Sequence, residues 1–245
     1  MPYNLSFISD EDLFNHVQET INKYRFSINL EEFNKNLIDP IKLTFDSKIY
    51  GKSIEEIIES ESIRQIDKSN TNHIGYFHQN IFKYFDDWEV PKEGFDVISE
   101  KHKVFVEMKN KHNTMNAASS QKTYIKMQDK ILQDDEATCY LIEVIAKNSQ
   151  DIPWKISLEK KQMSHKKIRR ASIDKFYTMV TGEKNAFKDL CEILPNVIDD
   201  VIKQTQKGAI QNSVFTDLCS ISPDLMKSIY LLSFEKYEGF NSLEF

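Results

Sequence analysis

Three residues in the middle of the chain, Asp96, Glu107 and Lys109, have the types and spacing of a chemical site. They occur in the segment GFDVISEKHKVFVEMKNK, where apolar residues surround the glutamate and the lysine. Side chains two positions apart on a β-strand point to the same face, so Glu107 and Lys109 would lie side by side. A hairpin would bring the Asp96 carboxylate next to that of Glu107. Buried charges are unfavourable unless they are paired, so these residues form either a structural ion pair or a site.

Two carboxylates that converge in a buried place repel each other, and a divalent cation removes that conflict. Carboxylate oxygens suit Mg²⁺, which keeps several waters and shares its coordination shell with phosphate groups. The ion lowers the pKa of a water and offsets charge on a phosphate, while a lysine orients the water or stabilises the developing charge. The three residues therefore predict hydrolysis of a phosphodiester bond, with Asp96 and Glu107 as the metal ligands and Lys109 as a catalytic residue.

The elements that would position these residues predict a mixed α/β core, with a sheet flanked by helices. Short segments rich in β-branched and aromatic residues predict two or three antiparallel strands, and a helix and a further strand follow. The strand segments are 88–90, 95–99, 103–110 and 137–147, and the helix covers about 116–133. The last strand, ATCYLIEVIAK, is apolar on both faces, which is typical of a central parallel strand. A second match to the D…E-x-K spacing, Asp151, Glu159 and Lys161, lies in a polar run without such a context.

Helices are predicted on both sides of this core. In the first part, from about Ser9 to Phe85, breaks occur at Asp39-Pro40 and at Tyr50-Gly51, and Ser53 with Glu56 has the pattern of a capping box. A separate helix is expected over 74–85.

Near the other end, helices follow Asn185; Pro195 is expected to interrupt the first of them, and Ser222-Pro223-Asp224 to begin the second. We expect one elaborated domain over 1–245. Its catalytic core covers about 54–150, between a helical part at 1–53 and a basic and helical part at 151–245.

The overall charge argues against a polyanionic partner, but its distribution does not. The 245 residues carry a formal net charge of −6. Two segments are nevertheless basic: 101–130 holds seven lysines against two acids, and 155–175 holds eight lysines and arginines against two acids. An acidic protein with such segments can bind a polyanion locally. The three widely spaced cysteines and the acidic start, without a signal peptide or an apolar span, predict a protein of the reducing cytoplasm.

Longer motifs around the three residues resemble a known family. Asp96, Glu107 and Lys109 match the signature of the PD-(D/E)XK nuclease superfamily, although Phe95 stands where the superfamily name has proline. Four segments are similar to the type II restriction endonucleases that cut GGNCC or GGWCC sites, the SinI-like group. These segments are IRQIDKSNTNHIGYFHQNIF, GFDVISEKHKVFVEMKNKHNTMN, SSQKTYIKMQDK and SIDKFYTMVTGEKNAF. The resemblance covers most of residues 60 to 195.

The resemblance implies a Mg²⁺-dependent homodimer that cuts both strands of double-stranded DNA at a short palindromic site. It also implies a restriction-endonuclease-like fold in a prokaryotic cytoplasm, and a partner DNA methyltransferase that protects the host DNA. Polar residues just after Lys109 are candidates for reading bases, since lysine pairs with guanine edges and asparagine with adenine edges. These candidates are Lys111, His112, Asn113 and Asn116. Alternatively, they form a polar loop that caps the next helix.

Two further groups are candidates for supporting roles. Four basic residues of the second basic segment could line a DNA channel through phosphate contacts, or form a solvated face. They are Lys166, Lys167, Arg169 and Arg170. Glu61, His78 and Gln79 precede the catalytic strands, where nucleases of this fold sometimes place an auxiliary acid or polar group, but each could be structural.

Two other functions fit the same fold. A nuclease of DNA repair or of branched DNA would share the chemistry without a fixed target sequence. A binding module would keep the fold without chemistry, but it should have a defective ion site, and all three residues are present. No phosphate-binding glycine loop, nucleophilic serine motif or histidine metal spacing supports another class of active site.

Overall fold

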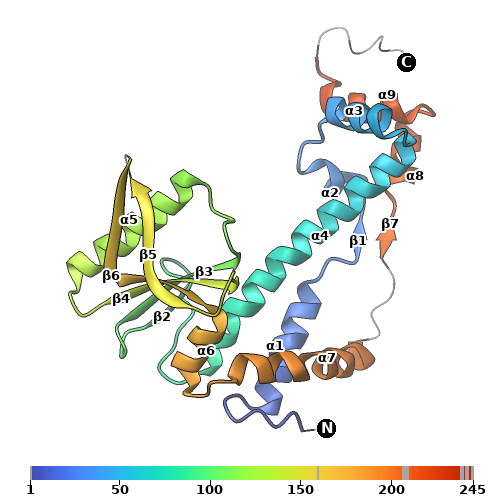
Figure 1. The fold of residues 1–245 in the computed structure, drawn as a ribbon. Coiled ribbons are helices and arrows are strands. Elements are labelled where there is room, and N and C mark those ends of the chain that lie inside the picture. The colour runs from blue at the N-terminus through green and yellow to red at the C-terminus, as the bar shows by residue number, and fades with distance from the viewer. Residues whose placement is uncertain (1, 159, 206–209, 238–239, 241–242, 244–245) are drawn as a thin grey trace. The chain divides into compact units, whose positions relative to one another are not determined.

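The computed structural model describes residues 2–158, 160–205, 210–237, 240 and 243. The chain forms two compact units, shown as ribbons in Figure 1. The first comprises Met1–Asn22 and Ile74–Thr205, and the second Lys23–His73 and Gln206–Phe245. Whether they fold as the single domain expected from the sequence stays a prediction, since helix α4 (Ile54–Asn80) belongs to both units. None of the helices in these described ranges is long and apolar enough to cross a membrane.

The first unit contains a mixed five-stranded sheet with the order β2-β3-β4-β6-β5. Its strands are β2 (Val97–Ser99), β3 (Val104–Lys111), β4 (Thr138–Ile145), β5 (Asp151–Leu158) and β6 (Lys161–Ser172). Strand β4 is parallel to both β3 and β6, while β2 and β5 pair antiparallel at the edges. This sheet confirms the predicted mixed α/β fold class and the central parallel position of the ATCYLIEVIAK strand.

Helices cover both faces of the sheet. Helix α5 (Ala117–Gln133) packs its buried Tyr124 and Met127 against Phe105 and Leu141 on one face. The opposite face, with Val104, Val106 and Met108, packs against the end of α4 and against apolar residues of three further helices. These helices are α1 (Asp10–Lys23), α6 (Ile173–Thr181) and α7 (Ala186–Thr205). The alternation predicted for the strand around Glu107 is therefore confirmed, because its odd and even residues enter different apolar clusters.

Local signals set several helix ends as predicted. Helix α3 (Pro40–Tyr50) begins at a proline, and the Asp39 side chain accepts hydrogen bonds from the first free amides. It ends at Gly51, whose φ of 63° favours glycine. Ser53 and Glu56 form the predicted capping box at the start of α4, with hydrogen bonds of 2.8 and 3.2 Å.

The second unit packs short helices around its own apolar cluster. Helices α2 (Leu30–Asn34), α8 (Val214–Ile221) and α9 (Leu225–Phe234) join α3 and the first part of α4 there. Asp224 caps α9, which confirms the start predicted at Ser222-Pro223-Asp224. Two short strands, β1 (Ser27–Ile28) and β7 (Gln211–Asn212), pair in parallel.

Three predictions about elements are wrong. The separate helix over 74–85 is the end of the continuous α4, followed by a 3-10 turn, η1 (Ile81–Tyr84), because nothing in the sequence before it breaks the helix. Helix α7 continues through Pro195, since its apolar residues Leu190, Val197 and Val201 are buried in the core and offset the lost hydrogen bond. The basic part after residue 150 is the hairpin β5–β6, so the sheet extends beyond the expected core boundary.

Candidate active site

The hairpin β2–β3 places Asp96 beside Glu107. Val97 pairs with Val106, and the Asp96 amide, one position earlier, donates to the Val106 carbonyl at 2.9 Å. The Met108 amide donates to Asp96 Oδ2 at 2.7 Å, which fixes the carboxylate against β3. Burial raises the pKa of Asp96, as does the charge of Glu107, although the Met108 hydrogen bond opposes this. The predicted convergence of two carboxylates is therefore present in the structure.

Glu107 lies between two ammonium groups. Its side chain is buried, with Lys109 Nζ 3.7 Å from Oε2 and with Lys126 Nζ ion-paired to Oε1. Lys126 comes from α5, donates to the Gly94 carbonyl at 2.6 Å and lies over the Phe95 ring at 4.3 Å. The site thus combines two carboxylates with two lysines, and its charges are balanced in pairs.

Lys126 is a site residue that the sequence analysis missed. It shares a helix stripe with Lys122 and Lys130, at the i, i+4 spacing that puts residues on one face. The ammonium of Lys130 lies 3.9 Å from the Phe105 ring centroid, so this stripe lies close to β3. The regular spacing was the available signal, but it does not distinguish Lys126 from its two neighbours.

The donor set at Asp96 and Glu107 fits a divalent cation that keeps much of its water. Within the described residues no group of three or more acidic, histidine or cysteine side chains could hold a metal. Two carboxylates are nevertheless the ordinary protein share of a Mg²⁺ site, where water and phosphate supply the other ligands. Burial, and to a smaller extent the Glu107 charge, raise the pKa of Asp96, and a cation bound there would favour the ionised carboxylate. At Glu107 Oε1 a metal would replace the ammonium of Lys126.

The four polar residues after Lys109 have different surroundings. Lys111 and Asn113 are exposed, and Asn113 has a φ of 55°. His112 is half-buried, with Nδ1 2.9 Å from Glu143 Oε2. Asn116 is the N-cap of α5, where its Oδ1 accepts from the Ser119 amide at 2.8 Å. The capping alternative thus applies to Asn116, and the reading of bases stays a prediction for all four.

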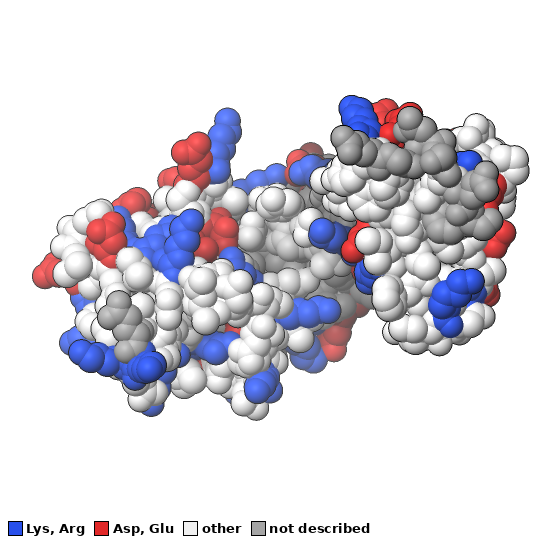
Figure 2. Space-filling view, turned by 90° about the horizontal axis from the view of Figure 1, so that it is seen from above, with Lys and Arg blue, Asp and Glu red and all other residues white. Residues whose placement is uncertain are grey.

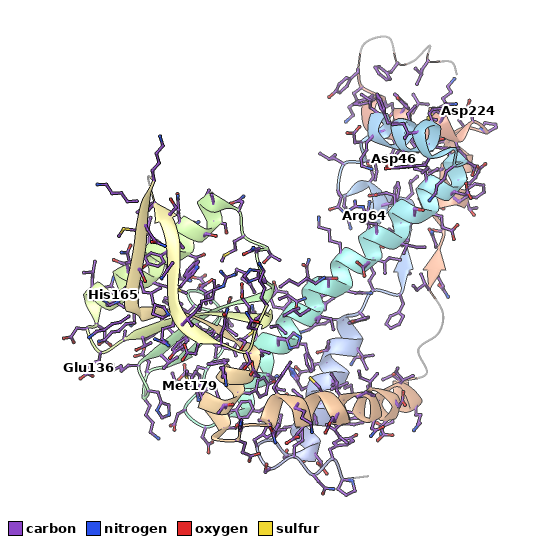
Figure 3. All side chains as sticks on the ribbon, in the orientation of Figure 1. Asp46, Arg64, Glu136, His165, Met179 and Asp224 are labelled. Atoms are coloured by element: carbon purple, nitrogen blue, oxygen red, sulfur yellow. The ribbon has the colours of Figure 1, made fainter. Side chains whose placement is uncertain are left out.

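The basic residues of β6 do not share one surface. Lys166 is exposed, while Lys167 donates to the Asp135 carbonyl and Arg169 pairs with Asp151 at 2.6 Å. Arg170 lies beside Leu141 in the register of the sheet, on the same face as Glu107. Lys and Arg residues are spread over the face of the sheet-containing unit that Figure 2 shows, and His165 in Figure 3 marks the part of β6 next to Lys166.

The three auxiliary candidates are placed differently. His78 and Gln79 are half-buried near the end of α4, and the ring centroids of His78 and Phe77 are 5.3 Å apart. Glu61 belongs to the second unit, where it pairs with Arg64 and accepts from Gln65 at 3.1 Å. Burial raises the pKa of Glu61, but its hydrogen bonds from Arg64 and Gln65 outweigh this and hold that pKa below the ordinary value. An auxiliary role in the site stays a prediction for all three residues.

We expect acid to destabilise the protein partly through His78. Burial, together with the nearby His16, lowers the pKa of His78 to about 4, from the ordinary 6.5. Between these pH values the unfolded chain binds the proton and the folded chain does not, so the free energy of unfolding decreases as the pH decreases. The full effect is on the order of 3 kcal/mol. Urea unfolding at several pH values between 7 and 4 measures it.

In that experiment His78→Gln should lose stability less steeply with falling pH than the wild type does. A matched variant at the exposed His165, His165→Gln, should keep the wild-type slope. Equal slopes for all three proteins would contradict the assignment of this acid sensitivity to His78.

Comparisons with known proteins agree on one family. The model of the Eco47II restriction endonuclease family matches residues 5–203. The type II restriction enzyme Sau96I of Staphylococcus aureus is 34% identical over 220 residues, which cover 84% of each chain. The type II restriction enzyme Eco47II of Escherichia coli is 29% identical over 214 residues, covering 82% of this chain and 89% of the relative. The matched region includes the whole five-stranded sheet and the Asp96–Glu107 site.

Proposed function

Because the chain belongs to the Eco47II family of type II restriction endonucleases, we propose that it cuts double-stranded DNA at a short palindromic GGNCC or GGWCC site with Mg²⁺. The convergence of Asp96 and Glu107 beside Lys109 is the observation that carries this proposal. The target sequence rests on the resemblance of the chain's motifs to the SinI-like group. The site itself supports the reaction type, not the sequence that is cut.

Each residue of the site has a defined part in the proposed hydrolysis. Asp96 and Glu107 would hold Mg²⁺, which lowers the pKa of water and offsets negative charge on the scissile phosphate. The Met108 amide keeps the Asp96 carboxylate in place, so this ligand needs no rearrangement. Lys109 is held 3.7 Å from Glu107 Oε2, where its ammonium can orient the attacking water or stabilise charge that develops on the phosphate.

Lys126 also has a role in the proposed reaction. In the structure its ammonium neutralises the Glu107 oxygen that a metal ion would otherwise contact. With Glu107 acting as a metal ligand, the flexible Lys126 side chain would no longer be paired with it and would supply an additional positive charge for the phosphate, because α5 packs on the sheet beside Glu107.

The proposed function also includes a homodimer and a protecting enzyme. A palindromic target has two-fold symmetry, and a two-fold dimer would place one active site at each strand. A nuclease that cuts a short common sequence would also destroy its host's DNA. We therefore expect a DNA methyltransferase as a functional partner that marks the same site, without a stable complex.

A plasmid digest tests this function. Purified protein is incubated with unmethylated plasmid of known sequence in Mg²⁺, beside a control with EDTA, and the fragment ends are sequenced. We expect discrete ends at GGNCC or GGWCC sites in Mg²⁺ only. Smearing, or nicks at branched junctions, would instead indicate a structure-selective nuclease. Absence of cleavage by folded protein would indicate that Glu107 and Lys109 form a structural ion pair and not a catalytic site.

A further inference from the structure

Glu143 is a buried acid that the proposed reaction does not use. It lies on β4 and is 2% exposed, and a buried charge is unfavourable unless it is paired. Its partners come from two other segments: Arg170 of β6 pairs with Oε1, and His112, just after β3, lies 2.9 Å from Oε2. Burial raises the pKa of Glu143, but its hydrogen bonds from Arg170 and His112 outweigh this and hold that pKa below the ordinary value. Glu143 is therefore ionised, and each of its carboxylate oxygens has a partner.

The same arginine holds the segment that follows the catalytic strand. Arg170 Nη2 lies 2.6 Å from His112 Nδ1 and 3.3 Å from Asn113 Oδ1. The His112 amide also donates to the Ile145 carbonyl at 2.9 Å. One guanidinium thus contacts two consecutive residues of a turn in which Asn113 has a φ of 55°, a conformation that asparagine tolerates. The turn is tied to the sheet at its side chains as well as at its backbone.

This arrangement lies directly beside the proposed catalytic residues. Lys109 and Glu143 are partners in the register of β3 and β4, and Glu107 is in line with Leu141 and Arg170 across three strands. Lys109, Asn113, Glu143 and Arg170 line one cavity of about 40 Å³. The residues that would do the chemistry and those that would read bases are therefore fixed to one face of the same sheet.

We infer that Glu143 and Arg170 are a positioning pair that orients His112 and Asn113 for reading bases, an inference that rests on the proposed function. Glu143 fixes both the guanidinium of Arg170 and the His112 ring, whose Nδ1 donates to it, and Arg170 donates to the Asn113 side chain. A hydrogen bond to a base edge discriminates only when its donor is held in one place. Arg170 therefore determines specificity through its neighbours, in contrast to a phosphate contact, which is indifferent to sequence.

Cleavage of two short duplexes tests the pair. One carries the site that the wild type cuts, and the other has a single base pair of that site altered. We expect Arg170→Lys and Glu143→Gln to lower the ratio of kcat/KM between the two duplexes by about tenfold to a hundredfold, the scale of one base contact. Lys166→Gln, a matched change at an exposed residue of β6, should lower both values equally and keep the ratio.

An unchanged ratio with Arg170→Lys and Glu143→Gln, beside a normal wild type, would overturn the inference. If both kcat/KM values fell by the same factor, Arg170 would be a phosphate contact. Absence of site-specific cleavage by the wild type would instead contradict the proposed function itself. These results are distinguishable because the wild type is measured beside each variant.

A double-mutant comparison keeps the inference testable if one variant is unstable. Asn113 is exposed, so Asn113→Ala should leave the fold intact. If Arg170 acts through Asn113, adding Glu143→Gln to Asn113→Ala should change the ratio much less than Glu143→Gln does alone. Fully additive effects would show that the pair does not act through Asn113 and would overturn that part of the inference. Thermal unfolding of each variant is recorded in parallel.

Discussion

Replacing Glu107 by glutamine is expected to lower the rate of DNA cleavage by roughly a thousandfold or more, while DNA is still bound. The change removes one of two carboxylates that would hold the metal, whose stabilisation of the transition state is worth several kcal/mol, and each 1.36 kcal/mol is tenfold in rate. The side chain keeps its size in a buried position, so the fold should persist. Single-turnover cleavage in Mg²⁺ gives the rate, and a mobility shift in EDTA gives the affinity.

A matched substitution at an exposed position controls for nonspecific effects. Glu136 is exposed in the turn between α5 and β4 (Figure 3), and Glu136→Gln should cut at the wild-type rate. Cleavage by Glu107→Gln within about tenfold of the wild type would contradict the assignment of the site, because a lost metal ligand costs more than that. A lower melting temperature of the variant would show that the two lysines beside Glu107 need its charge for stability.

Raising the salt concentration from 50 to 200 mM is expected to weaken DNA binding by about a thousandfold or more. Each phosphate that a lysine or arginine neutralises releases a counterion, and six to ten such contacts produce a loss of this size, on the order of 10³ to 10⁵. The net charge of −6 does not prevent this, since the basic residues are concentrated in two segments of the chain. Fluorescence anisotropy of a labelled duplex at several salt concentrations, in EDTA, measures the slope.

Individual lysines can be assigned from the same measurement. Lys166→Gln should reduce the slope of log K against log salt by about one, the contribution of one phosphate contact. Lys188→Gln is the control: this exposed lysine of α7 pairs with Glu192 at 2.8 Å, and the slope should not change. If the affinity of the wild type did not depend on salt, the prediction that β6 lines a DNA channel would be wrong. If Lys166→Gln kept the wild-type slope, only the phosphate contact of Lys166 would be contradicted.

The sequence by itself determined the features that depend on neighbouring residues. The period of two around Glu107 predicted which side chains share a face of β3, and the structure separates them into two apolar clusters. The β-branched and aromatic run at 137–147 predicted the central strand β4. Proline and glycine predicted both ends of α3. These features were predictable because the interactions that produce them act within a few positions along the chain.

The tertiary structure alone decided which distant side chains meet. Lys126 is 19 positions from Glu107, and only the packing of α5 on the sheet selects it from a stripe of three lysines. The pairing of Glu143 with Arg170 required β6 to lie next to β4, and the polar sequence of β6 lacks the apolar alternation that predicts a strand. Such contacts depend on how elements pack across the sheet, which no local period encodes, and so the surroundings of the site had to come from the fold.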